Sequence, residues 1–254
     1  MDQPTRRQVL GALSGTALLA FGAAPARSAA GLDPVEPNQS TQIQTDESLP
    51  TVALDWRETV NGVVTEETDL SKTSTGHTGD VGLVVDEAVL PGDTGVVTLR
   101  ASLVDDTADG AESAAQSAAV SLHFALTDTA ENGRNEPERA AGDETAETGE
   151  LQDFATVELW RDMGLGTGNG AIEDIPFVTD GDEMIASGTL AEVDAHPVFD
   201  DGYPLSRSGE PCLSVGDAVY VTFRWSIPER AGNVIQGDSA QFVVGVTVEG
   251  CKNE

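Results

Sequence analysis

Three glutamates, Glu131, Glu136 and Glu138, lie close together in a stretch that also contains glycine, proline and asparagine. Carboxylate oxygens are the ligands that calcium prefers, so these three side chains could gather one cation between them. A solvated acidic loop is the alternative, and the composition favours it because acids occur in every segment of the chain. The sequence therefore suggests no cofactor other than calcium.

The histidines offer no catalytic or zinc-binding arrangement. His77, His123 and His196 are the only three, and none belongs to an HExxH motif or to an i, i+4 pair. No GxSxG motif follows residue 30, and no cysteine–histidine pair remains free once the two cysteines have paired. We therefore predict that the protein is not an enzyme and has no catalytic residues.

Residues 1–30 have the features of a twin-arginine export signal. Arg6 and Arg7 precede an uncharged run from Gly11 to Pro25, and small residues follow at the end of that run. The run is too short to anchor the protein in a bilayer. We therefore expect a protein that leaves the cytoplasm by the twin-arginine pathway, is secreted or held at the cell surface, and has no transmembrane anchor.

The two cysteines, Cys212 and Cys251, most simply form one disulfide in an exported protein. Closing a loop of about 40 residues restricts the unfolded chain by roughly 4 kcal/mol. A metal-binding pair is the rival interpretation. It is weak, because neither cysteine belongs to a CxxC motif or has a histidine nearby.

The chain carries an extreme negative charge, with 44 acidic residues against 13 Lys and Arg and a formal net charge of -31. Repulsion on this scale destabilises a compact state in dilute buffer. At 1 M salt it is screened, because the Debye length falls to about 3 Å. We interpret the composition as an adaptation to very high salt, and the same charge excludes nucleic acid as a partner.

From residue 51 onward, short β-prone runs alternate with Gly, Asp and Asn, which predicts an all-β fold. The predicted strands are Thr51–Arg57, Gly82–Leu90, Gly95–Val104, Ala118–Leu126, Phe154–Trp160, Met184–Val193, Ala218–Ser226 and Ser239–Val248. About eight or nine strands in one domain, residues 51–254, favour a two-sheet β-sandwich of the jelly-roll type. Residues 31–50 form a flexible acidic leader, and residues 128–150 form a long surface excursion that is either disordered or functional.

Several short motifs follow one another in a specific order across residues 51–254. They are Leu54-Asp55-Trp56, Glu158-Leu159-Trp160-Arg161-Asp162, Phe223-Arg224-Trp225-Ser226-Ile227-Pro228 and Gly232-Asn233-Val234-Ile235-Gln236-Gly237-Asp238-Ser239. As a set they resemble the motifs of secreted haloarchaeal proteins in the TasA/camelysin-like group, which carry a SipW-dependent type of signal peptide. The residues that carry the resemblance are Trp56, Trp160, Trp225, Asn233, Gln236 and Asp238.

The resemblance implies a structural role as a filament, matrix or cell-surface component, with other copies of the chain or matrix components as partners. TasA-like fibres are joined by donated strands, and residues 40–45 of the leader would be the donor here. The group also carries alternating acids after its Trp-x-Asp motif, which makes Asp162 and Asn169 the corresponding calcium candidates. Two other functions remain open. One is a monomeric module for calcium or surface polysaccharide, built on residues 128–150 and 162–182, and the other is a metallopeptidase, the class assigned to camelysin relatives.

Overall fold

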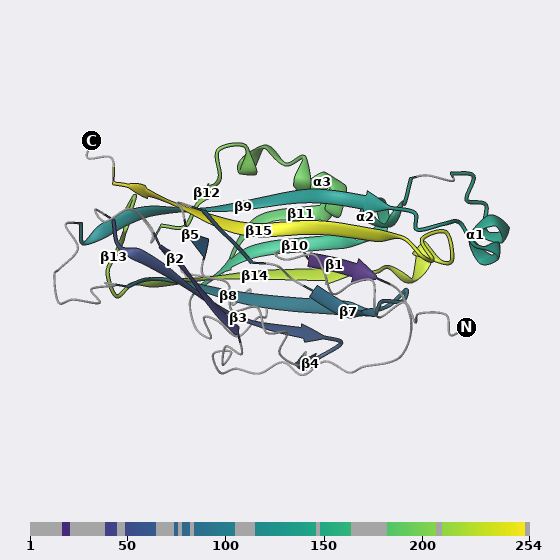
Figure 1. Ribbon diagram of the computed structural model, residues 1–254, viewed down its shortest axis with the longest axis horizontal. Coiled ribbons are helices and arrows are strands. Elements are labelled where there is room, and N and C mark those ends of the chain that lie inside the picture. The colour runs from purple at the N-terminus through teal and green to yellow at the C-terminus, as the bar shows by residue number, and fades with distance from the viewer. Residues whose placement is uncertain are drawn as a thin grey trace.

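The computed structural model describes residues 17–20, 39–44, 49–64, 74–75, 78–81, 84–104, 115–145, 148–163, 182–206 and 210–251. Fifteen strands lie in these residues and form two sheets that are antiparallel except for two short parallel pairs (Figure 1). The prediction of an all-β, two-sheet sandwich is therefore confirmed. No helix in the described part of the chain has the length and apolar character that crossing a membrane requires.

The first sheet has the order β12-β9-β15-β1-β7, with β13 also paired to β9 and β6 to β15. The bounds of its strands are β1 Ala17–Ala20, β6 Thr78–Val81, β7 Val84–Ala88, β9 Ser117–Ala130, β12 Tyr203–Pro204, β13 Leu213–Ser214 and β15 Ser239–Gly250. The β9–β15 pair is its longest ladder, and both strands run along the long axis of the molecule (Figure 1).

The second sheet has the order β11-β10-β14-β8-β3-β2-β5, with β4 also paired to β3. The bounds of its strands are β2 Gln39–Gln44, β3 Thr51–Val60, β4 Val63–Val64, β5 Ser74–Thr75, β8 Thr94–Val104, β10 Thr156–Asp162, β11 Glu183–Thr189 and β14 Ala218–Ser226. Each of the eight predicted runs overlaps a strand of this structure. The additional strands are short ones that the sequence did not predict.

The core lies between the sheets because the apolar residues of the long strands alternate with polar ones. On β14, Val219, Val221, Phe223 and Trp225 are buried on one face, as the period of two predicts. Phe223 packs against Phe242 of β15 in the opposite sheet, with ring centroids 4.9 Å apart. Aromatic contacts of this kind join the two layers at the centre of the sandwich.

The tryptophans of the predicted signature are buried in the second sheet. The ring of Trp225 covers Gly95 of β8, where an added Cβ would lie 2.2 Å from the indole. A side chain at residue 95 would therefore displace the tryptophan. Trp160 of β10 lies under the Arg224 guanidinium, whose carbon is 5.4 Å from the ring centroid, and Trp56 is buried on β3.

In the described residues, three short α-helices lie between the strands: α1 Glu136–Ala141, α2 Leu151–Phe154 and α3 Leu190–Asp194. Capping boxes start two of them, α1 and α3. The predicted strand Met184–Val193 is wrong in its second half, because β11 ends at Thr189. The Thr189 side chain accepts from the Glu192 N–H while Glu192 accepts from the Thr189 N–H, which starts α3 instead.

Part of the predicted leader is a strand rather than a mobile segment. β2 pairs antiparallel with β3, from Gln39 opposite Trp56 to Ile43 opposite Val52. The predicted donor segment therefore pairs within its own chain. Upstream, β1 comes from the predicted export signal and pairs with residues 240–242 of β15, whereas Arg6 and Arg7 lie outside the described residues.

The disulfide between Cys212 and Cys251 is present, as predicted, with 6.1 Å between the two Cα atoms. Cys212 precedes β13 and Cys251 follows β15, and the strand residues next to both cysteines pair with the start of β9. The bond therefore lies at one end of the β9–β15 ladder and joins the two strands that pair with the first residues of β9.

We expect Cys212→Ser or Cys251→Ser to lower the free energy of unfolding by about 4 kcal/mol, because the closed loop spans 39 residues and opening it frees the unfolded chain. Urea denaturation in molar potassium chloride measures the change. Reduction of the wild type should give the same loss. Identical urea midpoints with and without the bond would contradict this account.

Candidate metal centre

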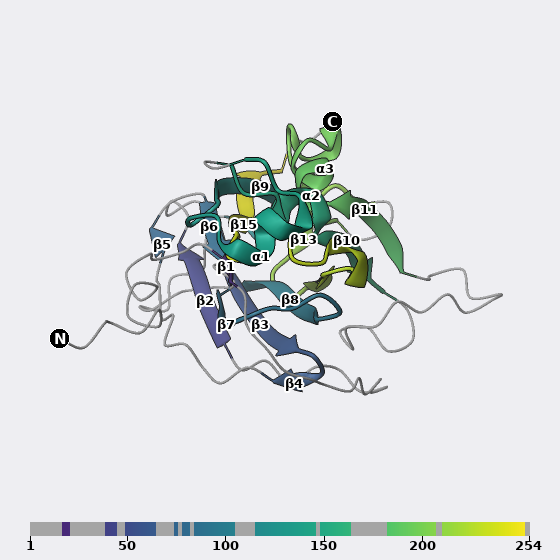
Figure 2. The ribbon, with the colours of Figure 1, turned by 90° about the vertical axis from the view of Figure 1, so that its right-hand side faces the viewer.

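An acidic site lies at the other end of the β9–β15 ladder. Ala130 and Ser239 form the last pair of that ladder. Glu131, the residue after β9, therefore lies next to Asp238, the residue before β15. The chain after Glu131 forms α1 beyond this end, and Figure 2 looks onto it with α1 in front of the strands. The topology therefore brings two carboxylates together from segments far apart in the sequence.

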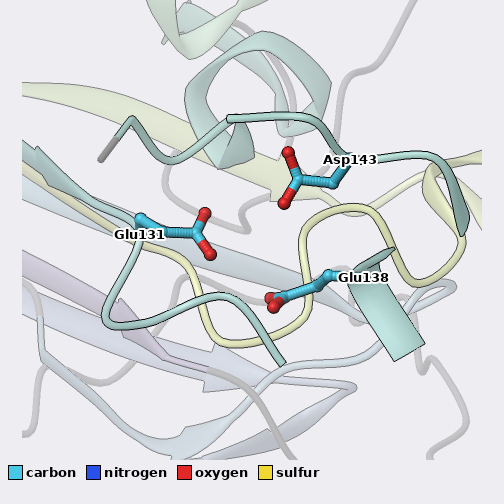
Figure 3. Close-up of side chains that lie close together, drawn as sticks. All are labelled: Glu131, Glu138 and Asp143. Atoms are coloured by element: carbon cyan, nitrogen blue, oxygen red, sulfur yellow. The ribbon is translucent and has the colours of Figure 1, made fainter. Parts of the chain in front are cut away.

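Five carboxylates gather here, and we call them the acidic cluster: Glu131, Glu138, Asp143, Glu150 and Asp238. They form two triads that share Glu131, one with Glu138 and Asp143 and the other with Glu150 and Asp238. Within each triad, one oxygen per residue lies within 4.8 Å of the others. Figure 3 shows the carboxylates of the first triad pointing into a common space.

Burial makes this cluster different from the acids on the surface. The exposed fractions are 3% for Glu131, 0% for Glu138, 6% for Asp143 and 0% for Asp238, while Glu150 is half-buried. Removing a carboxylate from water costs several kcal/mol unless a partner compensates. Such a group of carboxylates needs protons or cations to stay folded.

The first triad is positioned by the capping box of α1. The Asn135 N–H donates to Glu138 Oε2, and the Asn135 side chain accepts from the Glu138 N–H at 3.1 Å. Asp143 Oδ1 accepts from the Thr145 N–H at 2.8 Å. Each of these two carboxylates therefore has one oxygen held by a backbone donor.

The second triad is held in the same way. Asp238 Oδ2 accepts from the N–H groups of Glu150 and Leu151, at 2.6 and 3.1 Å, where α2 begins. Glu150 Oε1 accepts from the Thr145 hydroxyl. One oxygen of each carboxylate is again fixed, which orients the other oxygen.

When all five carboxylates are ionised, the remaining oxygens of the cluster have no hydrogen-bond donor, and they are shielded from solvent. They are both oxygens of Glu131, Glu138 Oε1, Asp143 Oδ2, Glu150 Oε2 and Asp238 Oδ1. Six buried acceptors without donors are unusual, because buried polar groups in folded proteins are nearly always satisfied. Calcium binds six to eight such oxygens at 2.3–2.6 Å, so the arrangement fits this ion.

Side-chain amides of Asn132 and Asn135 form hydrogen bonds with the turn before β15. Asn135 Nδ2 donates to the Gln236 carbonyl at 2.9 Å, and Asn132 Nδ2 donates to the Gly237 carbonyl at 3.0 Å. Gly237 has φ +104°, and a Cβ there would lie 3.1 Å from Glu138 Oε1. The glycine therefore lets the backbone pass beside the cluster without crowding it.

Burial raises the pKa of Asp238 to about 7, and the neighbouring Glu131 adds to the rise while the Glu150 N–H opposes it. Burial also raises the pKa of Glu131; a hydrogen bond with Asp238 opposes this rise, and repulsion from Glu138, Asp143 and Glu150 adds to it. The ion-free cluster therefore retains protons close to neutral pH. A divalent cation would replace them.

Comparisons with protein-family models, with curated proteins and with solved structures found no match to this chain. The resemblance to the TasA/camelysin-like group therefore remains a prediction. What the site does is argued from its own residues.

The structure brings together some of the predicted residues. Glu131 and Glu138 belong to the cluster, whereas Glu136 is exposed on the first turn of α1 and belongs to neither triad. Asp162 is buried on β10, near the Thr222 hydroxyl at 3.5 Å, and also lies outside both triads; Asn169 lies outside the described residues.

The signature residues of the 232–238 turn lie beside the cluster. Asp238 is one of its members, and Gln236 accepts from Asn135. The Asn233 carbonyl accepts from the Gln236 N–H at 3.2 Å, which tightens the turn. Signature residues of the resemblance thus lie beside two of the predicted calcium candidates, Glu131 and Glu138.

Asp143 and Glu150 are the two members that the sequence analysis missed. Both lie in the 128–150 excursion, which was predicted to be disordered or functional. Asp143 had a local signal, because it stands two residues before Thr145, a spacing at which an aspartate accepts from the following backbone N–H. Glu150 has no comparable local signal, because its role depends on Asp238 returning from the far end of the chain.

The donor set selects the kind of cation. Every member of the two triads is a carboxylate, and hard oxygen ligands suit calcium or magnesium rather than zinc, which favours nitrogen and sulfur. Magnesium prefers to keep several waters and an octahedral shell, whereas calcium accepts many protein oxygens. Calcium is therefore the best match.

Without divalent cations, we expect the protein to become more stable when the pH falls from 8 to 5.5. Between the ordinary value of 3.8 and the raised value of about 7, the folded state holds a proton at Asp238 that the unfolded state releases, so stability is lost as the pH rises. Saturating calcium should reverse the sign, because protons then compete with the ion. Thermal unfolding of cation-stripped protein in molar potassium chloride measures both slopes.

Asp238→Asn is the control for this pH dependence, since its side chain can still accept from the two backbone N–H groups but cannot titrate. Its stability should change less with pH than that of the wild type, with or without calcium. An equal slope in the wild type and the variant would contradict the assignment to Asp238.

Proposed function

We propose that the chain is a secreted, salt-adapted structural protein of the cell surface or extracellular matrix, whose β-sandwich is held together by calcium at the acidic cluster. The observation that carries this proposal is the set of six buried carboxylate oxygens without hydrogen-bond donors. They occupy the end of the longest ladder in the first sheet. Binding there would tie β9, α1 and the start of β15 to one another.

The position of the cluster favours a structural role for the ion over a catalytic one. A catalytic metal keeps an open coordination position for substrate, and its site contains groups that transfer protons. Here the carboxylates of both triads converge on buried space. Of the described histidines, His123 bonds Thr247 at 2.8 Å, and His196 accepts from the Val198 N–H at 3.3 Å.

Several independent features support work outside the cytoplasm. The disulfide suits an oxidising compartment, and the Arg6-Arg7 pair with its following apolar run suits export. Calcium is also a common ligand of extracellular modules, where it binds to sites of modest affinity. The resemblance to TasA/camelysin-like proteins agrees with a surface or matrix role.

We expect calcium to raise the stability of the folded protein in molar potassium chloride. Because the ion binds the folded state, free calcium at 100 times the Kd should add about 2.7 kcal/mol to the free energy of unfolding. Denaturant unfolding with and without calcium measures the gain, and magnesium at the same concentration should give less.

Two matched variants separate the site from general charge effects. Glu138→Gln removes one charge from the cluster but keeps an oxygen for the Asn135 N–H, and it should gain clearly less stability from calcium than the wild type. Glu136→Gln removes one charge from the exposed face of the same helix and should keep the full gain. Equal gains in both variants, or no gain in the wild type, would rule out calcium binding at the cluster.

A second proposal concerns assembly, and the pairing of β2 favours it. β2 comes from the leader and covers one side of β3, while β1 comes from the predicted export signal and covers residues 240–242 of β15. Removal of the signal would leave that stretch of β15 without its β1 partner, and exchange of β2 between copies would link them through β3. Unpaired strand edges of this kind bind added strands.

For assembly, we expect the secreted chain to form fibres at molar salt and a chain that begins at Leu49 to remain monomeric, because the shorter chain has no β2 to exchange. Light scattering measures the size of both chains, and electron microscopy of the cell surface with this protein labelled shows whether fibres form there. A secreted chain that stays strictly monomeric at every calcium concentration would argue against strand exchange.

A further inference from the structure

We propose that the acidic cluster binds two calcium ions, bridged by the carboxylate of Glu131. This inference rests on the calcium site proposed above and extends it to a second ion. It concerns Asp143, Glu150 and Asp238 as well as the two glutamates that the sequence suggested.

Geometry divides the cluster into two groups. Two ligands on opposite sides of one calcium ion are at most about 4.6–5.2 Å apart, twice the calcium–oxygen distance. Glu131, Glu138 and Asp143 meet a limit of 4.8 Å together, and so do Glu131, Glu150 and Asp238, but the two triads share only Glu131. Each triad can therefore surround its own ion, and Glu131 can contact both.

The free oxygens are distributed as a bridged pair of ions requires. Glu131 has two oxygens without partners, which is enough to contact two ions. Each of the other four carboxylates has one oxygen occupied by a donor and one free. Each ion would thus have three carboxylate ligands, and carbonyl groups or water would complete its shell.

Thr145 links the supports of the two triads. Its N–H donates to Asp143 Oδ1 in the first triad, and its hydroxyl donates to Glu150 Oε1 in the second. One residue therefore orients a ligand of each ion. Supporting hydrogen bonds of this kind fix the direction of first-shell ligands.

Charge also favours a second ion. Five ionised carboxylates leave three negative charges uncompensated around one calcium ion but only one around two ions. The four most buried members are at least nine-tenths shielded from water, so uncompensated charge there is costly. High external salt does not remove this cost, because screening is much weaker for buried charges than for exposed ones.

Isothermal titration of the cation-stripped full chain with calcium chloride, in molar potassium chloride, tests the proposal. We expect two ions per chain in the wild type and in Glu136→Gln. Glu138→Gln and Glu150→Gln should each bind one ion, and Glu131→Gln should lose both or bind each at least 10-fold more weakly.

The stoichiometry separates the two proposals. One ion per chain in the wild type would overturn the bridged pair while leaving the calcium site intact. No binding at all would overturn both. Circular dichroism of each variant before titration establishes that it is folded, and native mass spectrometry of the calcium-loaded wild type gives an independent count of the ions.

Discussion

Repulsion among five carboxylates in a shielded space is the constraint on which this end of the molecule depends. Burial raises the pKa values of Asp238 and Glu131, and repulsion from the neighbouring carboxylates adds to the rise. The fold nevertheless holds one oxygen of each of four carboxylates while the other stays free: backbone N–H groups hold Glu138, Asp143 and Asp238, and the Thr145 hydroxyl holds Glu150. Without cations, these buried charges destabilise the folded state. Bound cations would remove that destabilisation, which is why this local structure fits the proposed ligand.

The buried acidic cluster and the exposed acids respond differently to salt. Exposed acids give the chain its net charge of -31, and their mutual repulsion falls when molar salt shortens the Debye length to about 3 Å. Buried acids are screened far less. In a salt-adapted protein, bulk ions can therefore screen the repulsion between exposed acids, while the buried acids still need a specific divalent ion. The two requirements can be separated experimentally, because potassium satisfies the first and calcium the second.

The long strands were predictable because their chemistry is local. Residues 218–226 alternate apolar and polar side chains, and the observed β14 has these bounds. The strand predicted to continue to Val193 failed because the Thr189–Glu192 capping box starts a helix there. In the acidic loop, Glu138 turns inward and Glu136 outward because they occupy different positions of the capped first turn of α1. Glu150 could not be found from its neighbours, since its partner Asp238 arrives only when β15 pairs with β9.

At one end of the β9–β15 ladder the disulfide joins the two strands that pair with the start of β9, and at the other end the proposed calcium at Asp238 would tie the strands together. An antiparallel pair normally opens by fraying from an end, one hydrogen bond at a time. With both ends held in this way, a pull along the strands must instead load many bonds of the ladder in shear and break them together. Resistance to shear of this kind suits a subunit that carries tension. The calcium concentration around the cell would set how strongly the proposed calcium site holds its end of the ladder.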